Sequence, residues 1–327
     1  MTALAPHLSA YLREHLPRER AVSPHTVKTY ANCFVLLVQF AADRLKRRPT
    51  DLEVEDLDTD MIMAFLDHVE IGRGSCVRTR NGRLAAIRSF FRYIEYRIPA
   101  CLDQALRVRA IPTKKTDKAL IDYLDRAEIK ALLDTPDPRT RLGTRDRAML
   151  HLTYAGGLRV SELVTLQLGD FPDRSLSTMH IMGKGRRERV LPLWKETQIA
   201  LRAWLAIRPQ VEVTEIFLNA NGQPMTRDGF AFRLAEHVKT AATKQPSILG
   251  KRVTPHVLRH SCAMHTLAAT GDIRKVALWL GHASIQSTET YLRADPEEKL
   301  QILAAHGAPA IKPGRFKPPS DALITML

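Results

Sequence analysis

Residues 23–45 place apolar and polar side chains with the period of an α-helix. Apolar residues recur at steps of three and four, which puts them on one helical face. Ser23 is a suitable N-cap, and Pro24 follows in the first turn, where proline is tolerated. We therefore predict a helix that buries the face formed by Val27, Tyr30, Phe34, Leu37, Val38 and Ala41.

Two further helices are predicted in the first hundred residues, at about 59–69 and over 77–98. The second carries arginines on one side and the apolar residues Leu84, Ile87, Phe91 and Ile94 on the other. Its basic side could lie along phosphates or could be an ordinary solvated face, and the pattern favours neither. The region as a whole reads as helical.

Periodicity is lost over residues 106–118. Pro112 restricts its neighbours, and Lys114, Lys115 and Lys118 cluster there. We predict a basic, extended linker between two domains. It would either wrap a duplex or simply be exposed to solvent.

The second half of the chain mixes helices with a small sheet. An apolar helix over 145–155 should end at Gly156 and Gly157. Residues 177–193 read as two strands joined by a glycine-rich turn at 183–185.

Two helices are expected near the C-terminal end of this region. One opens at Thr254 and the proline after it, and should end at Gly271. The next should run from Asp272 to about Leu280 and stop at Gly281. The predicted fold class is therefore mainly α with a small antiparallel β-sheet.

The composition indicates a polyanionic partner. The chain has a net charge of +14 and a pI near 9.9, which favours DNA or RNA, although a ribosome-associated or membrane-surface protein would share it. No apolar run approaches the roughly 18 residues of a membrane span, and residues 1–20 lack the pattern of a secretion signal. We expect a cytoplasmic protein without a membrane partner. The four cysteines lack metal-ligand spacing, which indicates neither a disulfide framework nor a zinc site.

Two groups of charged residues stand where the pattern would otherwise place core. Arg159 lies in an apolar run, and Glu162 follows three residues later on the same helical face. A structural ion pair explains them as well as an anion site does. His256, Arg259 and His260 fall at i, i+3 and i+4 of one helix, where they would clamp a phosphate or form an exposed polar face.

Three further residues complete the set. Lys184 occupies the hairpin tip, where a solvated turn is the common explanation. His282 follows a helix-ending glycine, and Tyr291 lies on a short helix after it, where a tyrosine usually serves packing. Each signal alone is weak. Together they are cations, imidazoles and one hydroxyl nucleophile without an acidic cluster for magnesium, which suits phosphoryl transfer by side chains.

The order and the sequences of these segments resemble those of the tyrosine recombinases, also called the phage integrase family. Residues 23–98 are similar to the family's N-terminal core-binding helices. The remaining three boxes are TYAGGLRVSELVTL, IMGKGRRERVLPL and PHVLRHSCAMHTLAATGDIRKVALWLGHASIQSTETYLRAD. The resemblance spans nearly the whole chain, and four boxes in the right order make it specific.

The resemblance implies a role for each matching residue. Tyr291 would attack a DNA phosphate, form a 3′-phosphotyrosine and release a 5′-hydroxyl. Arg159 and Arg259 would bind the non-bridging oxygens and offset transition-state charge. His256 and His282 would add hydrogen bonds there, with His256 as the acceptor of the tyrosine proton.

Three other matching residues would assist. Lys184 would protonate the departing 5′-oxygen, Glu162 would support its neighbours, and His260 would stand behind the site without taking part in the chemistry. Gly156 and Cys262 depart from residues common in relatives, but neither replaces a catalytic group. The resemblance implies no metal, ATP or other cofactor.

The resemblance also implies a domain plan. It comprises a helical SAM-like core-binding domain over 1–105, a basic linker over 106–118, a mixed α/β catalytic domain over 119–300 and a tail over 301–327. The two domains would form a C-shaped clamp on double-stranded DNA recombination sites, with four protomers on two duplexes and with partner recombinases where these are required. The short amphipathic pattern of the tail suggests docking on a neighbouring subunit.

The resemblance leaves the biological role open. The GRFKPP stretch and the sequence around Tyr291 resemble those of integrases of transposons and insertion elements. This resemblance favours integration or excision of a mobile element. Alternatives are a chromosomal Xer-type resolvase, a catalytically silent DNA-binding regulator and a type IB topoisomerase. A hydrolase using Cys262 or Ser161 lacks any supporting motif.

Overall fold

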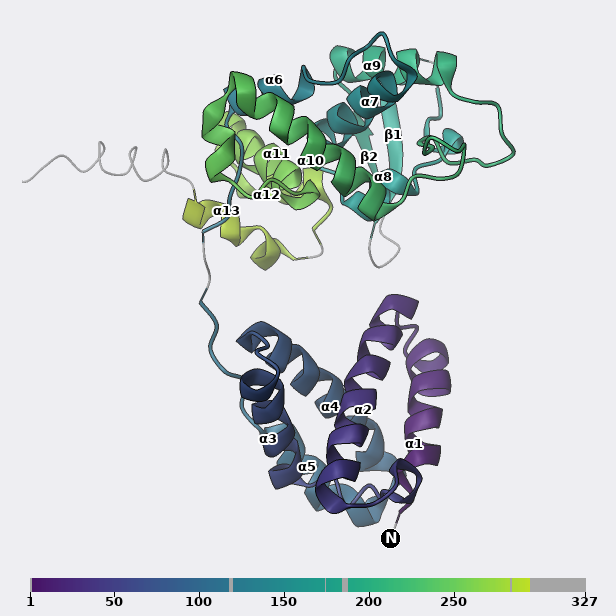
Figure 1. Cartoon of the computed structure of the whole chain (residues 1–327), viewed down its shortest axis with the longest axis vertical. Coiled ribbons are helices and arrows are strands. Elements are labelled where there is room, and N and C mark those ends of the chain that lie inside the picture. The colour runs from purple at the N-terminus through teal and green to yellow at the C-terminus, as the bar shows by residue number, and fades with distance from the viewer. Residues whose placement is uncertain (1, 118–119, 174, 184–187, 283, 295–327) are drawn as a thin grey trace, which may run out of the picture. The chain divides into compact units, whose positions relative to one another are not determined.

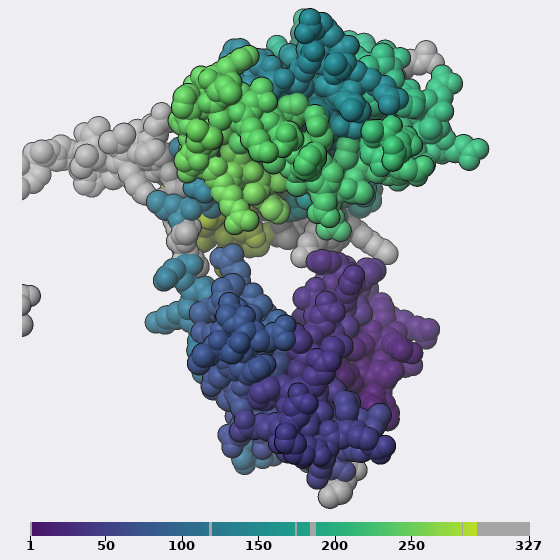
Figure 2. Space-filling view, viewed as in Figure 1, coloured from purple at the N-terminus to yellow at the C-terminus, as the bar shows by residue number. Residues whose placement is uncertain are grey.

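The computed structural model describes residues 2–117, 120–173, 175–183, 188–282 and 284–294. The chain divides into two compact units, Met1–Lys118 and Ala119–Leu327, each with its own hydrophobic core (Figure 1). Side chains fill the space between the ribbons of each unit (Figure 2). None of the helices in the described ranges is long and apolar enough to cross a bilayer.

The first unit is a bundle of helices around an apolar core. As predicted, Ser23 caps a helix, with its side chain accepting a hydrogen bond from the Thr26 amide at 3.3 Å. Phe34 and Leu37 lie in the core. The elements are α1 (Leu4–Ala10), η1 (Tyr11–Glu19), α2 (Pro24–Leu45), η2 (Pro49–Asp51), α3 (Thr59–Asp67), η3 (His68–Gly72), α4 (Val77–Arg97), η4 (Pro99–Cys101) and α5 (Leu102–Ala110).

The expected linker begins later than predicted. Residues 106–110 belong to α5, because Ala105, Val108 and Ile111 bury their side chains in the core of this unit. Periodicity over so few residues gave no helical signal, whereas packing against α4 supplies the burial that makes the segment helical.

Two arginines on the basic side of α4 neither form a solvated face nor are free to lie along phosphates. Arg80 is buried and donates to the Pro112 carbonyl, with Glu70 at 3.8 Å. Arg88 donates to the Ile111 carbonyl. They hold the start of the extended segment against α4.

The second unit combines helices with a two-stranded antiparallel sheet. β1 and β2 pair Thr178 with Pro192 and Met182 with Glu188, which confirms the two predicted strands. Most of the predicted turn at 183–185 lies outside the described residues. The elements are α6 (Arg126–Leu133), α7 (Arg141–Ala155), α8 (Val160–Val164), η5 (Leu168–Asp170), β1 (Thr178–Met182), β2 (Glu188–Pro192), α9 (Lys195–Ile207), α10 (Arg227–Lys244), η6 (Pro246–Gly250), α11 (Pro255–Thr270), α12 (Ile273–Leu280), η7 (Ile285–Ser287) and α13 (Glu289–Ala294).

Glycines end the helices that border the site, as predicted. α7 ends at Gly156, and Gly157 has φ +54°, a left-handed conformation that favours glycine. A Cβ at Gly157 would lie 2.5 Å from Leu280 and 3.2 Å from the Cys262 sulfur. Gly271 and Gly281, at φ +58° and +64°, end α11 and α12. The Gly157 backbone can therefore approach α11 and α12 closely.

Candidate active site

Glu162 lies between two guanidinium groups. Arg159 precedes α8, and its Nη1 donates to Glu162 at 2.7 Å. Arg189, on β2, donates to both oxygens of the same carboxylate, at 3.2 and 2.8 Å. Burial alone would raise the pKa of Glu162, but Arg189 and Arg159 outweigh it and lower that pKa. Glu162 is therefore ionised and holds both arginines in place.

Arg159 remains available to a ligand despite this ion pair. Its side chain is 26% exposed, whereas that of Glu162 is 5% exposed. The sequence left an ion pair and an anion site as alternatives, and the geometry allows both at once, because a guanidinium has five N–H donors.

Arg259 is buried in α11 and held by backbone carbonyls. It donates to the Gly157 carbonyl, and its Nη2 donates to the Leu280 carbonyl at 2.8 Å. Burial and the nearby Arg159 lower the pKa of Arg259 to about 10, so it remains charged at neutral pH. No carboxylate among the described residues forms an ion pair with it. A buried cation held only by carbonyls favours an incoming anion.

Tyr291 is 2% exposed and contacts His260 directly. Its hydroxyl lies 3.0 Å from Nδ1 of His260, and the two rings meet edge to face with centroids 5.7 Å apart. Burial raises the pKa of Tyr291 to about 12, although Arg259 and Arg159 oppose the rise. The phenol is therefore protonated in the free protein.

The His282 ring lies nearly parallel to the Tyr291 ring and is held by Thr288. The His282 and Tyr291 rings stack at 10° with centroids 6.4 Å apart. Nδ1 of His282 lies 2.7 Å from the Thr288 hydroxyl, which is fully buried. Burial, with Arg259 and Arg159 nearby, lowers the pKa of His282 to about 4. The ring is thus neutral. In the tautomer in which Nδ1 accepts from the Thr288 hydroxyl, Nε2 carries the proton and can donate.

These groups form one electrostatic cluster. The charge of Arg259 affects the pKa of Tyr291, His260 and His282, and the charge of Arg159 affects those of Arg259, Tyr291 and His282. The structure therefore brings together Arg159, Glu162, Arg259, His260, His282 and Tyr291. Such a set can bind a phosphate and offer it a phenol oxygen.

Two of the predicted site residues, His256 and Lys184, are not among the groups that the described residues bring together around Tyr291. His256 is exposed at the start of α11 and, within the described residues, makes no hydrogen bond or ion pair. Its charge still affects the pKa of His260, which places it nearby. Lys184 lies outside the described residues, as does the tail over 301–327.

Two residues of the site were missed in the sequence. Arg189 lies in the basic run after the hairpin turn, and only the fold shows that it reaches Glu162. Its Nε is buried without a partner in the described part of the chain. Thr288 lies three residues before Tyr291, and its hydroxyl is ordinary in a sequence. No periodicity or spacing signal distinguishes either residue.

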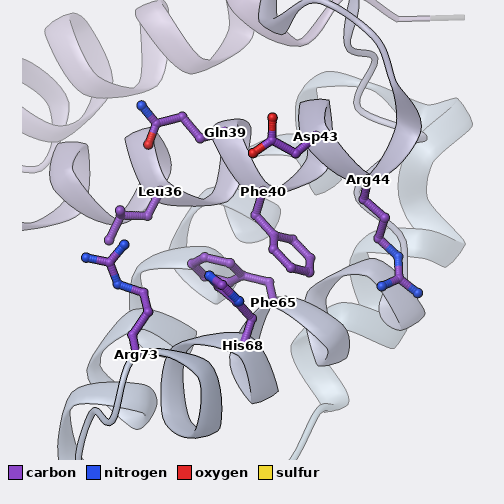
Figure 3. A pocket seen from close by; sticks show the side chains of 8 residues that line it. All are labelled: Leu36, Gln39, Phe40, Asp43, Arg44, Phe65, His68 and Arg73. Atoms are coloured by element: carbon purple, nitrogen blue, oxygen red, sulfur yellow. The ribbon is translucent and has the colours of Figure 1, made fainter.

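A hollow in the first unit provides a useful contrast. It has a volume of about 390 Å³ and is lined by Phe40 and His68, whose ring centroids lie 5.1 Å apart (Figure 3). Asp43, Arg44 and Arg73 also line it, but no tyrosine, serine, threonine or cysteine is among the described residues of its lining. Nowhere in the described ranges do three His, Cys, Asp or Glu side chains gather as a metal site would require.

A helical unit that brings a buried tyrosine together with arginines and histidines has the side chains that phosphoryl transfer by protein groups requires. Comparison with known families agrees. Residues 122–298 match the phage integrase family, and residues 8–97 match the phage integrase N-terminal SAM-like domain. The chain belongs to the phage integrase family and is a tyrosine recombinase, an enzyme of DNA strand breakage and rejoining.

Curated relatives extend over almost the whole chain. The putative integrase/recombinase y4rC of Sinorhizobium fredii is 40% identical over 321 residues, which cover 98% of this chain and 97% of the relative. Tyrosine recombinase XerC of Myxococcus xanthus is 35% identical over 310 residues, or 92% of this chain and 97% of XerC.

Solved structures share the fold. XerH bound to palindromic difH substrate, in a post-cleavage complex, has a TM-score of 0.66 at 20% identity, covering 90% of this chain and 83% of XerH. The Tn1549 transposon integrase in complex with transposon right end DNA has a TM-score of 0.63 at 18% identity, covering 93% and 100%. These matches confirm the predicted fold class of a helical N-terminal region followed by a recombinase catalytic region.

Proposed function

We propose that Tyr291 is the nucleophile of a site-specific recombination reaction on double-stranded DNA. Its hydroxyl attacks the scissile phosphorus, forms a 3′-phosphotyrosine and releases a 5′-hydroxyl. The observation that carries the proposal is the position of this buried phenol, whose pKa responds to both Arg259 and Arg159. Because the phosphotyrosyl bond retains the energy of the phosphodiester, rejoining requires no ATP.

The cations around Tyr291 stabilise the charge that develops on the phosphate. Arg159 is partly exposed and Arg259 lacks a carboxylate partner in the described residues, so both can donate to non-bridging oxygens. His282 adds a donor through Nε2, and the exposed His256 adds another. Lys184 is proposed as the acid that protonates the 5′-oxygen, from its place between β1 and β2.

Each subunit is proposed to cut one DNA strand, so strand exchange between two duplexes requires four subunits. We propose that four protomers assemble on two recombination sites in the cytoplasm, with the helical N-terminal unit and the catalytic unit both binding DNA. The net charge of +14 supports this contact with the phosphate backbone. The sequence around Tyr291 supports a mobile element as the substrate, which the enzyme integrates or excises.

Covalent trapping tests the chemistry. The probe is a set of nicked duplexes tiled across the DNA that flanks the gene, because a nick lets the cleaved fragment diffuse away and the adduct accumulate. We expect a protein–DNA adduct that survives denaturation in the wild type and is lost in Tyr291→Phe with DNA binding unchanged. Tyr154→Phe is the matched control and should form the adduct at the wild-type level.

Absence of an adduct with the wild type on every duplex would contradict the proposal, as would an adduct that persists in Tyr291→Phe. A recombination assay on plasmids with two sites then separates strand exchange from relaxation of supercoils, which is the outcome for a topoisomerase. DNA binding without an adduct would identify a silent regulator.

A further inference from the structure

We propose that His260, on α11, accepts the proton of Tyr291 during cleavage and returns it during rejoining. The inference rests on the proposed function, in which Tyr291 is the nucleophile. It assigns a direct part in the chemistry to a residue that the sequence places only behind the site.

The contact is specific in geometry. Nδ1 of His260 lies 3.0 Å from the Tyr291 hydroxyl, which is within hydrogen-bonding distance. The edge-to-face arrangement of the two rings points the edge of one at the other. Because Tyr291 is 2% exposed, its hydroxyl needs a protein partner, and His260 is the partner that it has within the described residues.

The other two histidines of the site, His282 and His256, do not contact the Tyr291 hydroxyl through a hydrogen bond that the structure describes. Nδ1 of His282 is occupied by Thr288, and no hydrogen bond joins His282 to the Tyr291 hydroxyl among the described residues. His256 is exposed one helical turn before His260 and has no hydrogen bond in the described part of the chain. An exposed imidazole at this position can meet the incoming phosphate.

Neighbouring charges keep His260 neutral while the site is free. Burial, His256 and Arg259 lower the pKa of His260, so one of its ring nitrogens carries a lone pair. In the tautomer with the proton on Nε2 this nitrogen is Nδ1, which then accepts the hydrogen bond of the phenol. The groups that face it are His256 and Arg259 on α11, His282 after α12 and Tyr291 on α13. A bound phosphodiester offsets the positive charge of Arg259 and so raises the proton affinity of His260.

The Tyr291 O–H bond breaks while its oxygen bonds to phosphorus, and the proton passes to Nδ1 of His260. The bond between phosphorus and the 5′-oxygen breaks, and that oxygen takes a proton from the acid proposed above, Lys184. In rejoining, both protons return. His260 thus alternates between imidazole and imidazolium.

The same helix supplies a matched control. Nδ1 of His265 lies 2.8 Å from the hydroxyl of Tyr154, and these rings also meet edge to face, with centroids 5.8 Å apart. Replacing His265 therefore removes an equivalent tyrosine contact from α11 without touching the reacting groups.

The experiment measures single-turnover adduct formation on a nicked duplex that the wild type cleaves. We expect His260→Ala to lower the rate constant by about 100-fold or more, the size of a lost general base, at unchanged DNA affinity. Added imidazole should restore part of the rate in proportion to its free-base concentration. His265→Ala should remain within about threefold of the wild type, given the modest cost of a lost hydrogen bond.

A second probe carries sulfur in place of the bridging 5′-oxygen, so that the leaving group needs no proton. This duplex should not restore His260→Ala, and restoration would assign His260 to the leaving group and overturn the proposal. A rate for His260→Ala near that of the wild type would also overturn it. So would a slow variant that imidazole fails to rescue, because such a variant has lost packing only. If the wild type itself forms no adduct, the proposed function fails first and the inference fails with it.

Discussion

Two tyrosine–histidine pairs have their histidine on α11, and they are nearly alike. The hydroxyl-to-Nδ1 distance is 3.0 Å for Tyr291–His260 and 2.8 Å for Tyr154–His265. Burial raises the pKa of both tyrosines to about 12 and lowers the pKa of both histidines. A buried phenol hydrogen-bonded to a neutral imidazole is therefore not enough to define an active site.

The difference lies in what surrounds each phenol. Arg259 and Arg159 both lower the pKa of Tyr291, whereas Arg126 is the only cation among the causes that act on Tyr154. Tyr154 instead borders a largely apolar hollow of about 460 Å³ with Trp194 and Trp279. Two guanidinium groups act on Tyr291, and one of them, Arg259, is buried without a carboxylate partner in the described residues. They can hold a phosphate together, so these surroundings make Tyr291 the candidate nucleophile.

Removing one guanidinium beside each tyrosine–histidine pair should give the largest difference in the rate of adduct formation. Arg159→Ala should lower single-turnover adduct formation by about 10²–10³-fold, as expected for a lost donor to transition-state charge. Arg126→Ala, beside the other pair, should change it by less than about threefold. Rates are measured at saturating DNA. Equal effects of the two substitutions would remove the distinction drawn between the two surroundings.

Removal of the Thr288 hydroxyl should have a smaller effect. Thr288→Val frees Nδ1 of His282, so the tautomer that presents Nε2–H is no longer favoured, and we expect a loss of about tenfold, equivalent to about 1.4 kcal/mol. Thr266→Val is the control, since the Thr266 hydroxyl bonds the Cys262 carbonyl near the other pair. A wild-type rate in Thr288→Val would show that the tautomer of His282 does not limit cleavage.

The smallest expected difference is in stability against pH. Burial lowers the pKa of His260 and of His265 below the unfolded value near 6.5, so the stability each contributes is present above that pH and declines as pH falls. His260→Gln and His265→Gln should both weaken the pH dependence of the unfolding free energy between pH 7 and pH 5, as urea denaturation measures. Only His260→Gln should also slow adduct formation. A steeper pH dependence in either variant would contradict the assigned direction.

Local signals explain the parts of the fold that could be predicted. Ser23, Gly157, Gly271 and Gly281 act through their own backbone and side-chain chemistry, and each borders a helix as expected. Residues 106–110 could not be recognised as helical, because their helix depends on burial against α4, which no local window contains.

For the site, the sequence by itself determined which reactive groups are present: a tyrosine, two arginines, Glu162 and the histidines, in boxes that resemble one family. The tertiary structure alone decided how they pair. Arg189 reaches Glu162 from β2, and His260, not His256, contacts Tyr291. The reason is physical, since a hydrogen bond between residues about 30 positions apart depends on how β2, α11 and α13 pack, and spacing along the chain carries no record of that packing.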